Sequence, residues 1–186
     1  MALQQIGAGE HVPNDINVII EIAASSDPIK YEICKNANIL QVDRILATSM
    51  SYPANYGYVP HTLCDDGDPI DVLVVTPYPL MPGCVIRSRP IGLLEMEDEA
   101  GKDSKILALP IEKVTRIYNK IKDINDMPDV FLNTIVHFFE HYKKLSPDKW
   151  VKVEGWRDAE AAKAAIKASV KMYGNDSGKV SSDTVQ

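Results

Sequence analysis

The sequence predicts a single α+β domain in which a small, closed or half-closed antiparallel β-barrel comes first and two helices follow. Three observations support this fold class. The first 110 residues contain short β-forming runs separated by turn clusters. The remainder contains two stretches with apolar residues at helical spacing. The length of 186 residues is enough for one domain with a sizeable core.

The strands are expected where short apolar or alternating runs lie between turn clusters. The predicted strands span residues 16–22, 28–34, 39–46, 70–75, 84–97 and 105–110. The clusters SSDP, DDGDP, TPYPLMPG and DEAGKDS separate them and are rich in residues that favour turns. In the long run 84–97, Pro90 and Gly92 predict a bend, because neither suits a regular strand interior.

The first helix is expected after residue 126. Asp126 is predicted to cap it, with Pro128 at the first helical position. Its apolar residues recur at helical spacing and are Val130, Phe131, Ile135, Phe138, Phe139 and Tyr142.

The second helix is expected to begin at Asp158, and Gly174 is predicted to end it. One apolar stripe runs along it, formed by Ala162, Ile166, Val170 and Tyr173. Residues 1–174 are therefore predicted to form one domain, and the polar residues 175–186 a disordered tail.

Composition excludes several classes of protein. The net charge of −6 argues against a general nucleic-acid surface, which needs clustered Lys and Arg. No apolar run is long enough to predict a membrane span, and MALQQIGAGEHVP lacks the features of a secretory signal. Cys34, Cys64 and Cys84 are widely spaced, which argues against a disulfide framework or a zinc ribbon. A reducing cytoplasm is the expected location.

The segment DDGDPID (65–71) is unusually acidic for the entry to a buried strand. Asp-Gly and Pro69 favour a tight turn, and one interpretation of the segment is a turn alone. The alternative rests on Asp66, Asp68 and Asp71, which a bend would bring together. Crowded carboxylates repel one another unless cations lie between them, and oxygen ligands favour Mg²⁺ or Mn²⁺. An EF-hand is excluded because its glycine and bidentate positions would fall on Asp71 and Pro77.

Two further acidic features allow the same two interpretations. The segment 95–105 is either a solvated hairpin tip or the opposite wall of a cleft, with Asp98 and Asp103 flanking the turn. Glu21 stands alone in an apolar run and must face either solvent or a partner.

Cations and phenols would complement such acids. Lys30, Arg44, Lys105 and Lys143 lie near predicted element ends, where each is either a surface cation or a phosphate ligand. The segment SYPANYGYVP (51–60) carries tyrosines that either fill the barrel or donate to phosphate oxygens. A cleft with acids, cations and phenols suits a polyanion presented by metal ions.

A competing interpretation comes from HFFEH (137–141), which fits the H-x-x-E-H zinc-hydrolase pattern. His137 and His141 would lie one helical turn apart and could share a Zn²⁺. No third ligand is obvious, and the two phenylalanines between them are better explained as core residues.

Taken together, these segments resemble the family I soluble inorganic pyrophosphatases in their bacterial form. The D-G-D-P-x-D pattern is specific to that family, and the likeness runs in order from about Gly7 to Tyr173. The matching blocks are DPIKYE (27–32), SYPANYGYVPHTL (51–63), DGDPIDVLV (66–74), DEAGKDSK (98–105), HFFEHYK (137–143) and KVEGW (152–156).

The resemblance implies a five-stranded OB-like β-barrel with two packed α-helices, and hydrolysis of pyrophosphate with three to four Mg²⁺ ions. Mn²⁺ or Zn²⁺ are alternative ions. The implied metal ligands are Glu21, Asp66, Asp71, Asp98 and Asp103, with Asp68 accepting the proton from the attacking water. The implied phosphate ligands are Lys30, Arg44, Tyr56, Lys105, Tyr142 and Lys143, of which Lys30, Arg44 and Tyr56 are also expected to take part in catalysis. Glu32 and Tyr52 would support these groups from behind.

The resemblance also suggests a homohexamer built from two trimers, with His137, His141 and Asp27 near subunit contacts. A different class of function stays open as an alternative. A non-catalytic OB-type module that binds single-stranded nucleic acid would show a basic groove with stacking aromatics. The acidic loops and the pI of about 5.2 argue against that alternative.

Overall fold

The computed structural model describes residues 3–34 and 37–182 of the chain. The strands are β1 (Ile16–Ile22), β2 (Ile29–Cys34), β3 (Ile39–Ile45), β4 (Asn55–Tyr58), β5 (Asp71–Val74), β6 (Val85–Asp98), β7 (Gly101–Lys102), β8 (Lys105–Pro110) and β9 (Val151–Arg157). The helices are α1 (Asp129–His141) and α2 (Ala159–Ser182). Two short 3₁₀ turns are η1 (Leu3–Gln5) and η2 (Ile124–Asp126).

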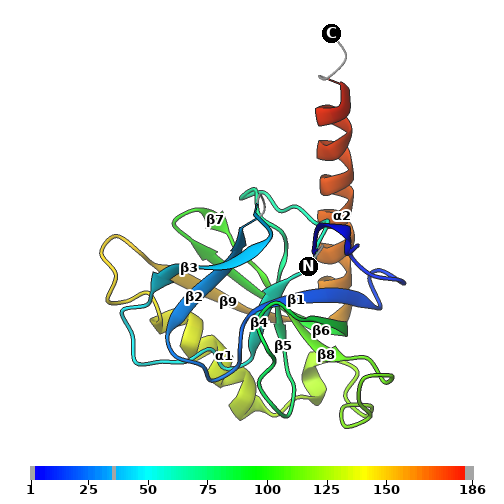
Figure 1. Cartoon of the computed structure of the whole chain (residues 1–186). Helices are drawn as coiled ribbons and strands as arrows, with labels where there is room; N and C mark the ends of the chain where they lie inside the picture. The colour runs from blue at the N-terminus through cyan, green and yellow to red at the C-terminus, as the bar shows by residue number, and fades with distance from the viewer. Residues whose placement is uncertain (1–2, 35–36, 183–186) are drawn as a thin grey trace.

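Five strands close into a ring. β1 pairs with β4, β4 with β5, β5 with β8, β8 with β6, and β6 returns to β1. The far end of β6 carries β7 and β9, while β2 and β3 form a separate two-stranded hairpin beside the ring (Figure 1). The predicted fold class, a five-stranded β-structure with two packed helices, is confirmed.

The expectation of a purely antiparallel barrel is wrong at one pair. β5 and β8 run parallel, with Asp71 opposite Lys105. Parallel neighbours require a crossover connection, which the long strand β6 supplies. The consequence for the site is direct, because both strands begin on the same side of the ring.

The two strands of this parallel pair are buried on both faces. Leu73 and Leu107 belong to the core that includes Phe138 of α1, whereas alternate residues of the same strands join the core that includes Ile166 of α2. This explains why the runs VLVV (72–75) and ILALP (106–110) are continuously apolar instead of alternating. The bend predicted at Pro90 and Gly92 is confirmed by a register shift between those residues.

The predicted strands agree closely with the observed ones, but β4, β7 and β9 were missed. β4 is only NYGY, and β7 only two residues, which is too short for a period to be read. β9 contains Gly155 at φ +131°, a backbone conformation that few residues other than glycine adopt.

The start of α1 differs from the prediction. Pro128 is the N-cap, and Asp126 lies in η2 instead, where its carboxylate accepts hydrogen bonds from the backbone N–H groups of Lys122 and Asp123. Asp123 and Asp126 cap that 3₁₀ turn reciprocally, so Asp126 is not available to α1. Val130 is 75 % exposed, and Leu132 takes the buried place expected for it.

The prediction that Gly174 ends the second helix is wrong. The backbone of α2 stays helical through Ser182, and Figure 1 shows the helix extending beyond the body of the sheet. A single glycine destabilises a helix by only about 1 kcal/mol relative to alanine, which is too little to end the helix. Residues 183–186 of the predicted tail lie outside the described residues, and the division of the chain at residue 174 stays a prediction.

Of the helices in the described part of the chain, none combines the length and the apolar character needed to cross a bilayer.

At Gly57, β4 leaves no room for a side chain against β1. A Cβ atom at this position would lie 1.9 Å from the carbonyl oxygen of Ile19, which belongs to the backbone and cannot rotate away. We expect Gly57→Ala to lower the free energy of unfolding by about 3 kcal/mol, measured by urea denaturation. Gly7→Ala is the control, because a Cβ there meets nothing within 4 Å. Equal stability of the two variants would contradict this account of the strand packing.

The capping role of Asp126 predicts an acid-dependent contribution to stability. Its two backbone hydrogen bonds, to Lys122 first and to Asp123, hold the pKa of Asp126 below its ordinary value of 3.8. The contribution is therefore present above pH 3.8 and is lost as the pH falls through the lowered pKa. Asp126→Ala should lower the urea midpoint near neutral pH, with the difference from wild type shrinking in acid. A difference that is independent of pH would show that the carboxylate charge is irrelevant.

Candidate active site

The acidic and basic residues singled out from the sequence meet at one side of the ring. Asp71 begins β5, Lys105 begins β8, and Asp98 ends β6. Asp103 lies in the short link between β7 and β8, and its backbone N–H donates to the Met96 carbonyl at 2.9 Å. The side chains are placed together because the parallel pair starts where β6 turns back towards β8.

Lys105 is the centre of this cluster. Its side chain is almost fully buried, and its Nζ forms ion pairs with the carboxylates of Asp71 and Asp103. The same ammonium donates to the Tyr56 hydroxyl at 3.4 Å. Burial alone would lower the pKa of Lys105, but the charges of Asp71 and Asp103 outweigh burial and raise the pKa. Burial also raises the pKa of Asp103 against the opposing effect of Lys105. The ammonium is therefore charged at neutral pH.

A second lysine pairs with Asp98. Lys143 Nζ lies 2.6 Å from Asp98 Oδ2 and 3.6 Å from Glu99 Oε2. Glu99 in turn pairs with Lys149 at 2.5 Å. Neither Glu99 nor Lys149 was singled out from the sequence. The signal for Glu99 was its place in the acidic turn, of which only Asp98 and Asp103 were selected.

Three buried tyrosines, Tyr52, Tyr56 and Tyr142, pack beside the cluster, and Tyr56 contacts Lys105 directly. Tyr52 packs against Tyr56, with ring centroids 5.2 Å apart, and against Phe138 of α1 at 4.7 Å. Tyr142 also stacks on Phe138, with ring centroids 5.0 Å apart. Burial raises the pKa of Tyr52, Tyr56 and Tyr142, so the three remain neutral hydroxyl groups that can donate hydrogen bonds.

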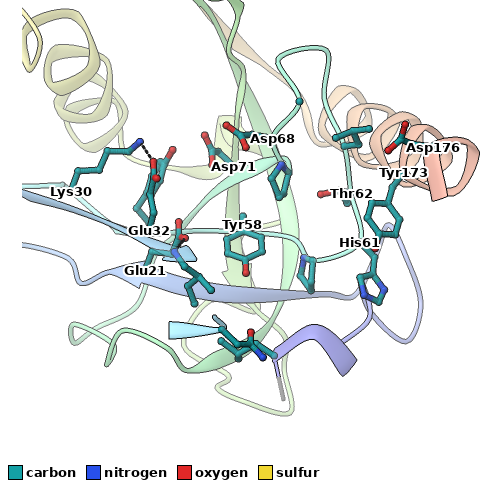
Figure 2. Close-up of a pocket in the computed structure, with 18 residues that line it drawn as sticks. Glu21, Lys30, Glu32, Tyr58, His61, Thr62, Asp68, Asp71, Tyr173 and Asp176 are labelled. Carbon is teal, nitrogen blue, oxygen red and sulfur yellow. Dashed lines mark hydrogen bonds and ion pairs between the residues drawn. The ribbon is translucent and has the colours of Figure 1, made fainter. Parts of the chain in front are cut away.

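The β2–β3 hairpin supplies two cations. Lys30 and Arg44 are register partners across the hairpin. Asp43 joins them, since its carboxylate lies 3.3 Å from Lys30 Nζ and 3.2 Å from Arg44 Nε. Lys30 also forms an ion pair with Glu32 (dashed in Figure 2). Asp43 was not selected from the sequence, although it directly precedes Arg44.

Glu21 has a partner and does not face solvent. It is 7 % exposed, and its carboxylate accepts a 2.7 Å hydrogen bond from the backbone N–H of Ile33 in β2. Burial raises the pKa of Glu21 to about 8, with Asp71 and Glu32 adding to the effect and the Ile33 bond opposing it. This contact ties the hairpin to the ring.

The segment 65–71 forms a turn whose residues line two cavities. Asp66 Oδ1 accepts from the Asp68 backbone N–H at 3.0 Å, and Gly67 has φ +87°. The Asp68 carbonyl accepts from Cys64 N–H at 2.8 Å. The predicted turn is therefore observed, with Asp68 lining the larger of two cavities and Asp66 the smaller. The alternative, that these acids gather around cations, stays a prediction.

Two cavities meet at this turn. The larger, of about 620 Å³, is lined by Glu21, Lys30, Glu32, Tyr56, Asp68 and Asp71 at one end. Figure 2 shows Tyr58 between this end and His61, Tyr173 and Asp176 at the other. The smaller, of about 210 Å³, is lined by Asp66, Asp71 and Asp103. Asp71 therefore faces both.

Most of the predicted site residues are thus linked by contact, directly or through one neighbour. Asp71, Asp103, Tyr56 and Lys105 form one cluster, and Glu21 lies near enough for the charge of Asp71 to contribute, after burial, to the raised pKa of Glu21. Asp98 pairs with Lys143, and Lys30 and Arg44 share the carboxylate of Asp43; of these residues, Lys30 lines the larger cavity.

Within residues 3–34 and 37–182, no three His, Cys, Asp or Glu side chains stand in an arrangement that holds a metal. At the acidic cluster, lysine ammonium groups lie against the carboxylates of Asp71, Asp103 and Asp98. The candidate ligands nevertheless fit a hard divalent cation, because all of them are carboxylate oxygens. Two of them, on Asp71 and Asp103, already hold the positive ammonium group of Lys105 between them.

The histidine pair is separate from this cluster. His137 is exposed on α1, its ring centroid is 4.2 Å from that of His141, and His141 Nδ1 bonds to the His137 carbonyl at 2.8 Å. One imidazole nitrogen is thereby occupied. The zinc-hydrolase interpretation gains no third ligand among the described residues.

Comparison with known proteins identifies the family. The model of the inorganic pyrophosphatase family matches residues 18–174. Inorganic pyrophosphatase of Escherichia coli K12 is 58 % identical over 175 residues, covering 94 % of this chain and 99 % of that protein. Inorganic pyrophosphatase of Pseudomonas aeruginosa is 56 % identical over 173 residues, covering 93 % and 99 %.

Solved structures agree. The Coxiella burnetii inorganic pyrophosphatase superposes with a TM-score of 0.88 at 51 % identity, covering 90 % of this chain and 99 % of that one. A crystal structure of an Anaplasma phagocytophilum protein described as an inorganic phosphatase gives a TM-score of 0.90 at 47 % identity, covering 91 % and 99 %. The resemblance recognised in the sequence is confirmed: this chain belongs to the family I soluble inorganic pyrophosphatases of bacterial type.

Proposed function

We propose that this protein hydrolyses inorganic pyrophosphate to two orthophosphates by in-line attack of an activated water. The observation that carries the proposal is the convergence of carboxylates, lysines and neutral phenols on one pair of adjoining cavities. A polyanion needs cations around it, and the acids provide sites for them. The names of the relatives support the choice of substrate.

We assign the divalent cations to the carboxylates. Glu21, Asp66, Asp71, Asp98 and Asp103 would hold three to four ions, with Mg²⁺ as the proposed metal and Mn²⁺ or Zn²⁺ as alternatives. When bound, such ions neutralise phosphate charge and lower the pKa of a water so that hydroxide forms near neutral pH.

The chain's own groups bind the substrate and move the proton. Asp68 is exposed beside Asp71 at the larger cavity, and we assign it the role of proton acceptor from the attacking water. The phosphate ligands are Lys30, Arg44, Tyr56, Lys105, Tyr142 and Lys143, supported by Glu32 and Tyr52. The phenols donate from neutral hydroxyl groups, which suits them to phosphate oxygens.

We also propose a homohexamer of two trimers in the cytoplasm. The support is the resemblance, together with the outward position of His137 and His141 on α1 and the exposure of Asp27. Light scattering should give the mass of six chains, and the mass of a single chain at all concentrations would contradict the assembly.

A non-catalytic OB-type binding module is the second candidate. It requires retention on single-stranded DNA at low salt without divalent cations. The net charge of −6 favours the enzyme over this alternative.

The proposed reaction is tested by phosphate release from pyrophosphate with Mg²⁺ and with EDTA. Release should require Mg²⁺, and Asp68→Asn should reduce kcat by about 10²-fold or more, because the amide cannot accept the proton. Asp65→Asn is the matched control, since Asp65 is an exposed acid in the same turn that lines only the smaller cavity.

The outcomes separate the parts of the proposal. Release that persists in Asp68→Asn at the wild-type rate would keep the reaction and remove Asp68 from this role. Absence of release with Mg²⁺ or Mn²⁺ would reject the reaction itself and favour the binding module.

A further inference from the structure

The side chain of Lys105 lies between two of the proposed metal ligands, Asp71 and Asp103. Lys105 is 3 % exposed, and its ammonium contacts Asp71, Asp103 and the hydroxyl of Tyr56. Asp71 and Asp103 are only partly exposed, so two carboxylates held this close without a cation would be unfavourable, because like charges repel and water screens them incompletely. The ammonium therefore does for this pair what a divalent ion would do.

We propose that Lys105 is an internal counter-cation that competes with the divalent metal for Asp71 and Asp103 and is released toward the phosphate when the metal binds. The inference rests on the metal ligands assigned under the proposed function. It adds an order of events: the metal first displaces the ammonium, and only then does the ammonium become available to substrate.

The competition follows from the number of charges. A divalent ion bound at Asp71 and Asp103 neutralises both carboxylates and repels the ammonium beside it. A buried ammonium that has lost its partners needs another anion, and the phosphate is the anion the site receives. Metal binding would thus favour phosphate binding in two ways: the ion adds positive charge, and the ammonium of Lys105 becomes free to contact the phosphate.

The same arrangement recurs at another proposed ligand. Lys143 Nζ lies 2.6 Å from Asp98 Oδ2, with Glu99 as an alternative partner at 3.6 Å. Lys30 is different, because it pairs with Glu32 and Asp43, neither of which is a proposed metal ligand. Substitution of Lys30 is therefore a matched control, because it removes one positive charge from the site and leaves Asp71 and Asp103 with their partner Lys105.

The first test is calorimetric titration of Mg²⁺ into phosphate-free, metal-stripped protein. Lys105→Met should bind Mg²⁺ about tenfold more tightly than wild type, because the competitor is gone. The metal-stripped variant should melt at a lower temperature than wild type and gain more on Mg²⁺ addition. Lys30→Met should change Mg²⁺ affinity much less. Affinity in Lys105→Met equal to or weaker than wild type, or equal tightening in both variants, would overturn the proposal.

A second measurement needs no variant. In wild-type protein, Mg²⁺ should increase the rate at which Lys105 is acetylated by acetic anhydride, followed by mass spectrometry, because the ammonium leaves its partners. Exposed Lys113 is the internal control, with no expected change. A Lys105 rate unaffected by Mg²⁺ would overturn the proposal, and this holds even if Lys105→Met does not fold.

Failure of the inference is distinguishable from failure of the proposed function. Wild-type protein that binds Mg²⁺ and releases phosphate from pyrophosphate, but shows neither effect at Lys105, keeps the function and rejects the counter-cation. Wild-type protein that binds no Mg²⁺ rejects both.

Discussion

The buried ion cluster of Lys105 with Asp71 and Asp103 is the interaction on which the rest of the site depends. Its members come from β8, from the start of β5 and from the link before β8, and Tyr56 of β4 completes it. None of these charges is tolerable in the interior alone, because the loss of one partner leaves another uncompensated. The strand ends must therefore meet in one register.

The parallel pairing of β5 and β8 provides that register. Asp71 and Lys105 are opposite residues at the first position of each strand, and the apolar residues that follow are buried on both faces. The acid and the base thus lie at the rim, where cavities open, while the remainder of each strand forms the core. Gly57 lets β1 approach β4 closely, which helps to bring Glu21 of β1 to the same rim.

Much of the fold was predictable because its signals are local. The run 16–22 gave the observed bounds of β1, and the spacing around Phe138 and Phe139 gave the buried face of α1. The misses have identifiable causes. β4 and β7 are too short to show a period, Asp126 caps the 3₁₀ turn η2, and the cost of the single glycine at position 174 is too small to end α2. In each case the deciding contact, or its absence, was not visible in the local pattern.

The sequence by itself determined which residue types are present, that acids lie where strands begin and end, and which family the blocks resemble. Only the tertiary structure decided that Lys105 lies between Asp71 and Asp103, that Glu21 bonds to Ile33, and that Glu99 and Asp43 belong to the ion network. The physical reason is that, apart from Lys105 with Asp103, these contacts join segments that are far apart in the chain. Where the partners lie on strands, their pairing depends on register, and a shift of one residue would turn each side chain to the opposite face.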